Sequence, residues 1–269
     1  MNLKNIKLVV SDMDGTLLNS QGKISQQFFK LYEKLQQKNI TFCAASGRQH
    51  NSIVDKLHPI KNDIYVIAEN GGVAKKGKTI LLENVLSAEK ILEVIPAIRK
   101  IKGANFVLCG KHGAFIESKD KKFIALFQEY YYNFTSVDDV TKIVNDTDFF
   151  KVAVYHFDSS EEFVYPNIQH LKDDFLLKVS GTNWLDISSK EANKGNALKV
   201  VQNILNISKE ETLVFGDYHN DIEMIQQASY SVAMGNAHKD IKALATITTK
   251  DNNNFGVEFV LEDLLKQQS

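Results

Sequence analysis

Short apolar runs alternate with amphipathic stretches at both ends of the chain, and this alternation limits the possible folds more than any other feature. The apolar runs have the length of strands buried on both faces, and the stretches between them carry apolar residues at helical spacing. Strand–helix–strand units of this kind form an open, mostly parallel sheet. In the first third of the chain, strands are expected at Ile6–Val10, at ITFCAAS and at DIYVIA.

Two local patterns sharpen this expectation. The stretch VAKKGKTILL predicts a hairpin that turns at Lys76-Gly77. Apolar residues at helical spacing predict a helix over Ser25–Lys38, with the Ser25 side chain as its N-cap. Its buried face should consist of Phe28, Leu31, Tyr32 and Leu35.

The middle of the chain follows a different pattern. Close pairs of expected strands, such as NFVLCG with GAFIE, lie between helices, which indicates a separate α+β unit with an antiparallel sheet. From Trp184 the earlier alternation resumes with the strand LDIS and a helix over Ala192–Leu205. We therefore predict an α/β core domain from 1–84 and 185–269, interrupted by a cap domain inserted at 85–184.

Composition excludes several classes of protein. The 269 residues are 43% hydrophobic and 24% charged, which suits a folded domain, and the net charge of −1 gives no reason to expect nucleic acid or an anionic membrane as partner. Cys43 and Cys109 lie in apolar runs and are expected to be buried free thiols. No segment has the apolar length of a membrane span or the form of a leader, so a cytoplasmic setting is expected.

Asp12 and Asp14 are the first candidate functional residues, because they follow the first expected strand directly. Ligands of open α/β sheets bind outside the carboxyl ends of the strands. Two carboxylates this close need positive charge nearby to remain ionised, and Mg²⁺ is bound through one or two carboxylates together with waters and phosphate oxygens. Alone, the pair would equally suit a solvated turn with Gly15.

A second acidic cluster strengthens the functional interpretation. TLVFGDYHNDIEM places Asp217 after another buried run, with Asn220 and Asp221 at the following helix start. Asn220 and Asp221 alone would suit an ordinary helix N-terminus. Asp217 repeats the strand-then-acid pattern of Asp12, so the two acids can converge on one metal ion.

Two further stretches suit phosphate. FCAASGRQH ends a strand with Ser46 and Gly47, whose hydroxyl and amide groups can surround phosphate oxygens. SSKEANKGNALKV puts Lys194 at the start of a helix, where the dipole disfavours a cation unless it meets an anion. Each stretch alone has an ordinary explanation, as a loop or a solvated lysine, whereas the set of four indicates a phosphate site.

DMDGTL, SGR, NKG and GDYHND, in this order, resemble the four motifs of the haloacid dehalogenase-like superfamily. More narrowly, the chain resembles the Cof-type (subfamily IIB) sugar-phosphate phosphatases over nearly its full length. That subfamily has a Rossmann-like core and inserts its cap between the second and third motifs, where the antiparallel region is expected here. ENGG matches a family loop that is commonly Asn-Gly-Ala, with Gly72 in place of the alanine.

The resemblance implies a Mg²⁺-dependent phosphatase and a role for each motif residue. Asp12 would be the nucleophile that forms an aspartyl-phosphate, and Asp14 the general acid and then the general base. The metal would be held by the Asp12 carboxylate, the Asp14 backbone carbonyl and the Asp217 carboxylate, with Asp221 as ligand or neighbour. The transferring phosphoryl group would be held by the Met13 amide, Ser46, Gly47, Lys194 and Asn220.

The implied substrate is a small phosphorylated metabolite, with sugar phosphates first; nucleotides, pyridoxal phosphate and flavin-precursor phosphates stay open. The nearest rival is a phosphotransferase such as a hexose phosphomutase, which would share the aspartyl-phosphate. A phospho-accepting signalling module of the receiver type is far shorter and lacks a cap. A glycosyltransferase with an Asp-x-Asp metal site would not explain Lys194 and Asp217.

The sequence leaves some properties undefined. Tyr218 and His219 occupy the variable pair of the fourth motif, and His219 is expected to be a surface histidine, although it could reach substrate. The cap residues that select the substrate are not identifiable. A monomer and a small homo-oligomer are equally compatible with the sequence.

Overall fold

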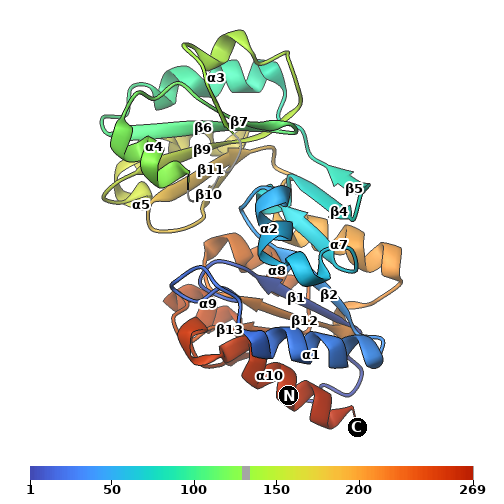
Figure 1. Cartoon of the computed structure of the whole chain (residues 1–269). Helices are drawn as coiled ribbons and strands as arrows, with labels where there is room; N and C mark the ends of the chain where they lie inside the picture. Colours follow the sequence, from blue (N-terminus) through green and yellow to red (C-terminus); the bar gives the residue numbers. More distant parts are fainter. Residues whose placement is uncertain (129–133, 269) are drawn as a thin grey trace.

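The structure is a computed structural model that describes residues 1–128 and 134–268. The chain forms two sheets (Figure 1). The main sheet consists of β1 (Leu8–Asp12), β2 (Thr41–Ala45), β3 (Tyr65–Ala68), β4 (Val73–Lys76), β5 (Thr79–Glu83), β12 (Thr212–Gly216), β13 (Tyr230–Ala233) and β14 (Ile247–Thr248). Its order is β14-β13-β12-β1-β2-β3-β4-β5. All neighbours are parallel except β3–β4 and β4–β5, so the open, mostly parallel sheet and the hairpin after Lys76 are confirmed.

Helices cover both faces of the main sheet (Figure 1). They are α1 (Gln26–Gln37), α2 (His50–Lys56), α7 (Lys194–Leu205), α8 (Ile222–Gln226), α9 (Lys239–Leu244) and α10 (Gly256–Gln267). Helix α1 packs beside α10, and α7 packs beside α8 on the opposite face. The prediction for α1 is confirmed, since Ser25 caps it by accepting the Phe28 N–H and the four expected residues are buried.

The second sheet lies above the first and forms the cap (Figure 1). Its strands are β6 (Ala104–Gly110), β7 (Gly113–Ile116), β8 (Phe134–Ser136), β9 (Phe149–His156), β10 (Leu176–Val179) and β11 (Trp184–Ser188), in the order β10-β11-β9-β6-β7-β8. All pairs are antiparallel except β7–β8, which agrees with the expected α+β cap. Its helices are α3 (Ala88–Ile98), α4 (Lys121–Phe127), α5 (Ser160–Phe163) and α6 (Tyr165–Ile168).

One strand differs from its expected place. Trp184–Ser188 was expected to open the return to the main sheet, but it pairs antiparallel with β9 and β10 in the cap sheet. Its alternate residues Leu185 and Ile187 are buried in the cap's own hydrophobic core, which explains the pairing. The domain division at 84/85 and 184/185 remains a prediction, and the cap sheet itself runs on to Ser188.

The alternation of β9 determines which cap residues face the core domain. Val152 and Val154 pack into the apolar core beneath α3, while Lys151, Ala153 and Tyr155 line the cavity between cap and core. In β11 the residues Trp184 and Asp186 face the same cavity. The period of two therefore separates an apolar face beneath α3 from a second face, where Lys151 and Asp186 lie beside a smaller apolar cluster that includes Phe123 and Phe127 of α4.

Cysteine burial and helix length are two further features of the structure. Cys43 and Cys109 are both buried and neither forms a disulfide bond, as predicted. Among residues 1–128 and 134–268, no helix is long and apolar enough to cross a bilayer.

Candidate active site

Chain segments far apart in the sequence meet at the carboxyl ends of β1, β2 and β12. Asp12 ends β1, Ser46 follows β2 and Asp217 follows β12, while Lys194 begins α7. All but Lys194 line or underlie one cavity of about 480 Å³ between core and cap. The convergence of strand ends that the sequence predicts is thus present in the fold.

Lys194 connects two acids at the base of this site. Its ammonium is fully buried and lies 2.5 Å from Asp12 Oδ1 and 2.7 Å from Asp221 Oδ1. Burial alone would lower the pKa of Lys194, but attraction to Asp12 and Asp221 outweighs it and raises that pKa above its usual value. The lysine therefore remains charged and holds Asp12 in place.

The cluster carries more negative charge than Lys194 can balance. Carboxylate oxygens of Asp12, Asp217 and Asp221 lie within 4.8 Å of one another. Burial raises the pKa of Asp12 well above its usual range, with Lys194 opposing and the other two acids adding to the shift. Burial and the charge of Asp221 raise the pKa of Asp217 to about 7. Such a group is stabilised by an additional cation.

A divalent cation fits the donor set at this point. Asp12 Oδ2 is buried and accepts no hydrogen bond from any described residue. Asp217 Oδ1 accepts one hydrogen bond, from the Thr16 hydroxyl at 3.1 Å. Carboxylate oxygens are the ligands that hard cations such as Mg²⁺ prefer.

Asp221 differs from the other two acids because both its oxygens have protein partners. Oδ1 accepts from Lys194, and Oδ2 accepts the backbone N–H groups of Asp217 (2.9 Å) and Tyr218 (3.2 Å). A side chain on Gly216 would collide with this carboxylate, since its Cβ would lie 2.6 Å from Oδ2. Asp221 thus braces the loop that carries Asp217, which favours a supporting position over direct metal ligation.

Asp14 lines the same cavity, but its carboxylate pairs with Arg48 and not with Lys194. Its carboxylate makes a two-pronged contact with Arg48, at 2.7 Å from Nε and 2.6 Å from Nη2. The Asp14 side chain is 47% exposed, whereas that of Arg48 is 10% exposed. Gly15, at φ +78°, turns the chain between Asp14 and the cluster, and any side chain there would strike Asp217. The glycine therefore allows the chain to turn directly beside Asp217.

The remaining predicted phosphate-binding residues differ in whether their side chains reach the cavity. Gly47, Ser46 and Asn220 line the cavity. The Met13 side chain is buried in the hydrophobic core, so only its backbone can serve the site. The Asn220 amide donates to Asn70 Oδ1 at 3.0 Å, which links the fourth motif to the ENGG loop.

A buried polar network across the cap–core boundary was not found from the sequence. Lys151 of β9 donates to the Gly47 carbonyl at 2.8 Å and to Asp186 at 3.1 Å, and it lies 3.2 Å from Glu69. Asn70 also donates to Asp186. The only sequence signal was a single lysine inside the apolar strand FFKVAVYHF.

The cap supplies the roof of the cavity. Tyr155 and Trp184 meet edge to face with ring centroids 4.8 Å apart. Beside them the strand-to-strand turn contributes polar groups. The cap residues that line the cavity include Ser180, Gly181, Thr182 and Asn183.

Comparison with known proteins identifies the family of the chain. The family of haloacid dehalogenase-like hydrolases matches residues 9–261. The chain is 30% identical over 269 residues to the 5-amino-6-(5-phospho-D-ribitylamino)uracil phosphatase YbjI of Escherichia coli, with 98% of each chain covered. Its fold superposes on SMU.1108c of Streptococcus mutans with a TM-score of 0.90 at 27% identity, covering 97% of this chain and 99% of that one. It also shares the fold of the subclass IIB sugar phosphatase BT4131, with a TM-score of 0.84 at 21% identity, 96% of this chain and 98% of that one.

Proposed function

The chain belongs to the haloacid dehalogenase-like hydrolases, in their Cof-type subfamily IIB, and is a phosphoric monoester hydrolase; from this premise we propose that it is a Mg²⁺-dependent phosphatase that uses Asp12 as nucleophile. Its substrates are small phosphorylated metabolites, with sugar phosphates as the first class. The observation that carries the mechanism is the Asp12 carboxylate itself. One oxygen is held by Lys194, and the other is buried without a partner among the described residues, beside a cavity that fits a metabolite.

In the first step, a carboxylate oxygen of Asp12 donates an electron pair to phosphorus, and the bond between phosphorus and the ester oxygen breaks. The departing oxygen takes a proton from Asp14 and leaves as an alcohol. The product is an acyl phosphate on Asp12. Lys194 supports this step because it fixes the orientation of the nucleophile at 2.5 Å.

In the second step, Asp14 takes a proton from water as the water oxygen attacks phosphorus. The bond from phosphorus to Asp12 breaks, inorganic phosphate leaves, and the Asp12 carboxylate is regenerated. Asp14 must give up its contact with Arg48 to reach the ester oxygen in the first step and the water in the second, since Arg48 occupies both its oxygens. We therefore assign Arg48 the role of holding Asp14 at the cavity edge between turnovers.

The phosphoryl oxygens are held by groups at the cavity floor and, for Lys194, directly beneath it. The candidates are the Ser46 hydroxyl, the backbone amides of Gly47 and Met13, and the side chains of Lys194 and Asn220. Phosphoryl transfer depends mainly on position and on stabilised charge, so a set of fixed donors suits the reaction. The Asn220–Asn70 hydrogen bond supports this assignment, because it orients the amide beside the cavity.

Mg²⁺ would be held by the carboxylates of Asp12 and Asp217 and by the Asp14 backbone carbonyl, with Asp221 behind them. When bound, it neutralises charge on the phosphate and on the acidic cluster. Asp221 fixes the loop that carries Asp217, because its carboxylate accepts hydrogen bonds from two backbone N–H groups of that loop.

The cavity roof bears on the choice of substrate. Tyr155 and Trp184 offer an aromatic wall, and the turn with Thr182 and Asn183 offers hydrogen-bonding groups. A polyol or sugar phosphate would use the polar turn alone. A phosphate ester that also carries a flat heterocycle would use both, and YbjI, named for such a substrate, makes this the second candidate class.

A panel of phosphorylated metabolites, assayed for released phosphate with Mg²⁺, tests the proposal. We expect hydrolysis of an aryl phosphate and of one or a few metabolites, and loss of both activities in EDTA. Formation of a phosphorylated isomer without free phosphate would favour the phosphomutase instead. Activity that survives EDTA would contradict the Mg²⁺ requirement. The proposal includes a cytoplasmic setting and no nucleic-acid or membrane partner.

A further inference from the structure

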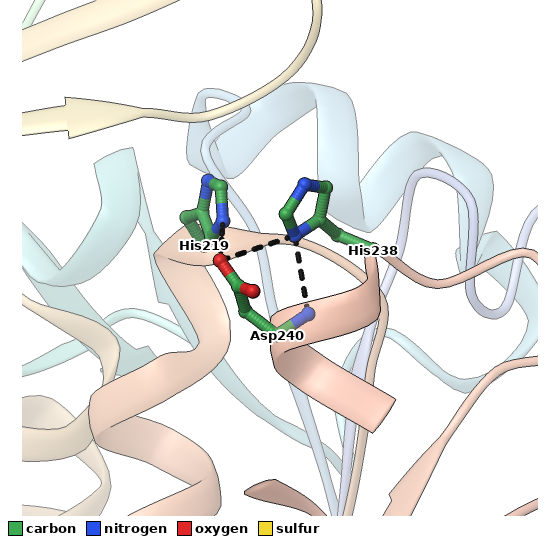
Figure 2. Close-up of side chains that lie close together, drawn as sticks. All are labelled: His219, His238 and Asp240. Carbon is green, nitrogen blue, oxygen red and sulfur yellow. Dashed lines mark hydrogen bonds and ion pairs between the residues drawn. The ribbon is translucent and has the colours of Figure 1, made fainter. Parts of the chain in front are cut away.

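We propose that His219, His238 and Asp240 form a second metal site, on the surface beside the cavity, for a borderline transition-metal ion such as Zn²⁺, Co²⁺ or Ni²⁺. The three side chains converge in Figure 2, and one ligand atom of each lies within 4.8 Å of the others. None of the three takes part in the mechanism above.

The separations between the ligand atoms suit one bound ion. Asp240 Oδ2 lies 3.1 Å from His219 Nε2 and 3.4 Å from His238 Nδ1 (Figure 2). Ligands placed about 2.0–2.1 Å from a tetrahedral ion lie about 3.3–3.4 Å from one another. An ion could therefore enter between the carboxylate and the imidazoles with small side-chain adjustments.

The backbone around the cluster is held from several directions. His219 begins a 3-10 turn at His219–Asp221, directly after Asp217 and Tyr218. His238 is the N-cap of α9, and its backbone N–H donates to the Asp217 carbonyl at 2.9 Å. The Tyr218 ring packs against both imidazoles, with centroids 5.1 Å and 5.8 Å away. Three ligands on two short segments are thus largely pre-positioned.

The donor chemistry separates this site from the acidic cluster. Two imidazole nitrogens and one carboxylate oxygen are typical ligands of Zn²⁺ and similar ions, while Mg²⁺ prefers oxygen ligands alone. The Asp12, Asp217 and Asp221 group offers only oxygens. Excess Mg²⁺ should therefore occupy the acidic cluster and leave the histidine site for a softer ion.

Solvent reaches the cluster, so an ion can enter and keep water as further ligands. The side chains are 19% exposed for His219, 27% for His238 and 57% for Asp240. One local contact competes with the ion, since the Asp240 backbone N–H donates to His238 Nδ1 at 3.3 Å. This hydrogen bond is long, and the amide can bond to water once the ion takes the nitrogen.

Because of where the site lies, a bound ion would connect two segments of the core domain. Bound there, the ion joins the turn that continues into Asn220 and Asp221 to the start of α9. The cap also contacts this part of the core domain. The Lys178 ammonium of β10 lies 3.5 Å from the His219 carbonyl oxygen and 2.6 Å from the Glu223 carboxylate. Ion binding should therefore stabilise the loop after β12 against unfolding.

Titration calorimetry with NiCl₂ as the probe, on the whole chain in excess Mg²⁺, tests the proposal. We expect one Ni²⁺ per chain, with affinity at least tenfold weaker in both His238→Ala and Asp240→Ala. His170→Ala, which removes an exposed histidine of the cap, is the matched control and should bind as the unchanged protein does. Absence of Ni²⁺ binding in excess Mg²⁺, or equal binding by all variants, would overturn the site.

Thermal unfolding in excess Mg²⁺ gives a second readout that does not depend on turnover. Ni²⁺ should raise the melting temperature of the unchanged protein and of His170→Ala, and raise it less in His238→Ala. Comparable melting temperatures without Ni²⁺ would show that the variants are folded. An equal Ni²⁺-induced rise in all three proteins would place the ion elsewhere and contradict the proposal.

Discussion

Two buried lysines occupy comparable settings in different parts of the molecule. Lys194 lies in the core domain between Asp12 and Asp221, and Lys151 lies in the cap between Asp186 and Glu69. Burial opposes the charge of both, yet the paired acids outweigh it and raise the pKa of each lysine. A buried lysine paired with two acids therefore occurs both in the core domain and in the cap.

The difference lies in what surrounds each lysine. Around Lys194 a third acid, Asp217, is present, and Asp12 Oδ2 lacks a hydrogen-bond partner among the described residues. Around Lys151 there are two acids, and Glu69 Oε2 likewise accepts no hydrogen bond among the described residues, although it lies 3.2 Å from the lysine; the additional partner of Lys151 is the Gly47 carbonyl, a neutral group. The first cluster places three acids around one lysine, one acid more than the second, and this larger excess of negative charge suits a cation. The second cluster has two acids and connects the cap to the core loops. A lysine between two acids therefore orients the nucleophile in the core domain and holds the cap on the core in the other region.

Asp12→Asn should separate chemistry from stability most strongly. We expect turnover to fall by at least about 10³-fold, because the amide cannot form the acyl phosphate. In EDTA the variant should melt at the same or a higher temperature, since the folded protein disfavours the Asp12 charge. Phosphate release and thermal unfolding, measured side by side, check both parts. A variant that retains turnover would remove Asp12 from the mechanism.

Lys194→Met should have the next largest effect on turnover, about 10²–10³-fold, because it removes a charge that orients the nucleophile. It also leaves Asp12 and Asp221 buried without their cation, so stability in EDTA should fall and be partly restored by Mg²⁺. Melting curves with and without Mg²⁺ measure this. Equal loss of stability in both conditions would indicate that Lys194 is only a packing residue.

Lys151→Met should affect stability more than chemistry. Removing the lysine leaves Glu69 and Asp186 buried without a charge partner, which costs about 3–5 kcal/mol. Turnover of an aryl phosphate should fall less than tenfold. Denaturant unfolding measures the loss, with the exposed Lys172→Met as control. Adding Glu69→Gln should restore part of the stability; if it restores none, the buried network does not balance charge as described.

Trp184→Leu should have the smallest effect on chemistry and should act on substrate choice. Loss of the aromatic wall should raise KM about tenfold for a substrate with a flat ring and change kcat little. Phe115→Leu, in the cap but outside the cavity lining, serves as the control. Equal changes for ring-bearing and ring-free substrates would contradict a role of Trp184 in selection.

The comparison of the two lysines also shows how far the sequence could predict the site. Asp12, Asp217 and Lys194 each stand at a strand or helix end, so their local sequence identifies them and the parallel sheet brings them together. Lys151 stands inside an apolar strand, and its partners Glu69 and Asp186 come from distant segments. That network requires the packing of cap on core, which no local pattern specifies.

Local sequence likewise determines some parts of the fold and leaves others open. The strands of the main sheet and the buried face of α1 could be predicted from periodicity. The position of β11 could not, because it depends on pairing with β9, which is distant in the sequence. The Asp14–Arg48 contact was also missed, although both residues lie in predicted motifs. Side-chain pairing between two loops depends on rotamers and on the relative position of the loops, which the motifs alone do not define.

Trapping the covalent intermediate tests the central claim, that Asp12 carries the phosphoryl group, most directly. Borohydride reduces an acyl phosphate to a primary alcohol, so Asp12 would become homoserine and could be located by peptide mass spectrometry. Asp14→Asn, which should slow hydrolysis of the intermediate, would be quenched during turnover of an aryl phosphate with Mg²⁺. We predict a mass change at Asp12 that requires substrate and Mg²⁺. Modification at another carboxylate instead would contradict the account.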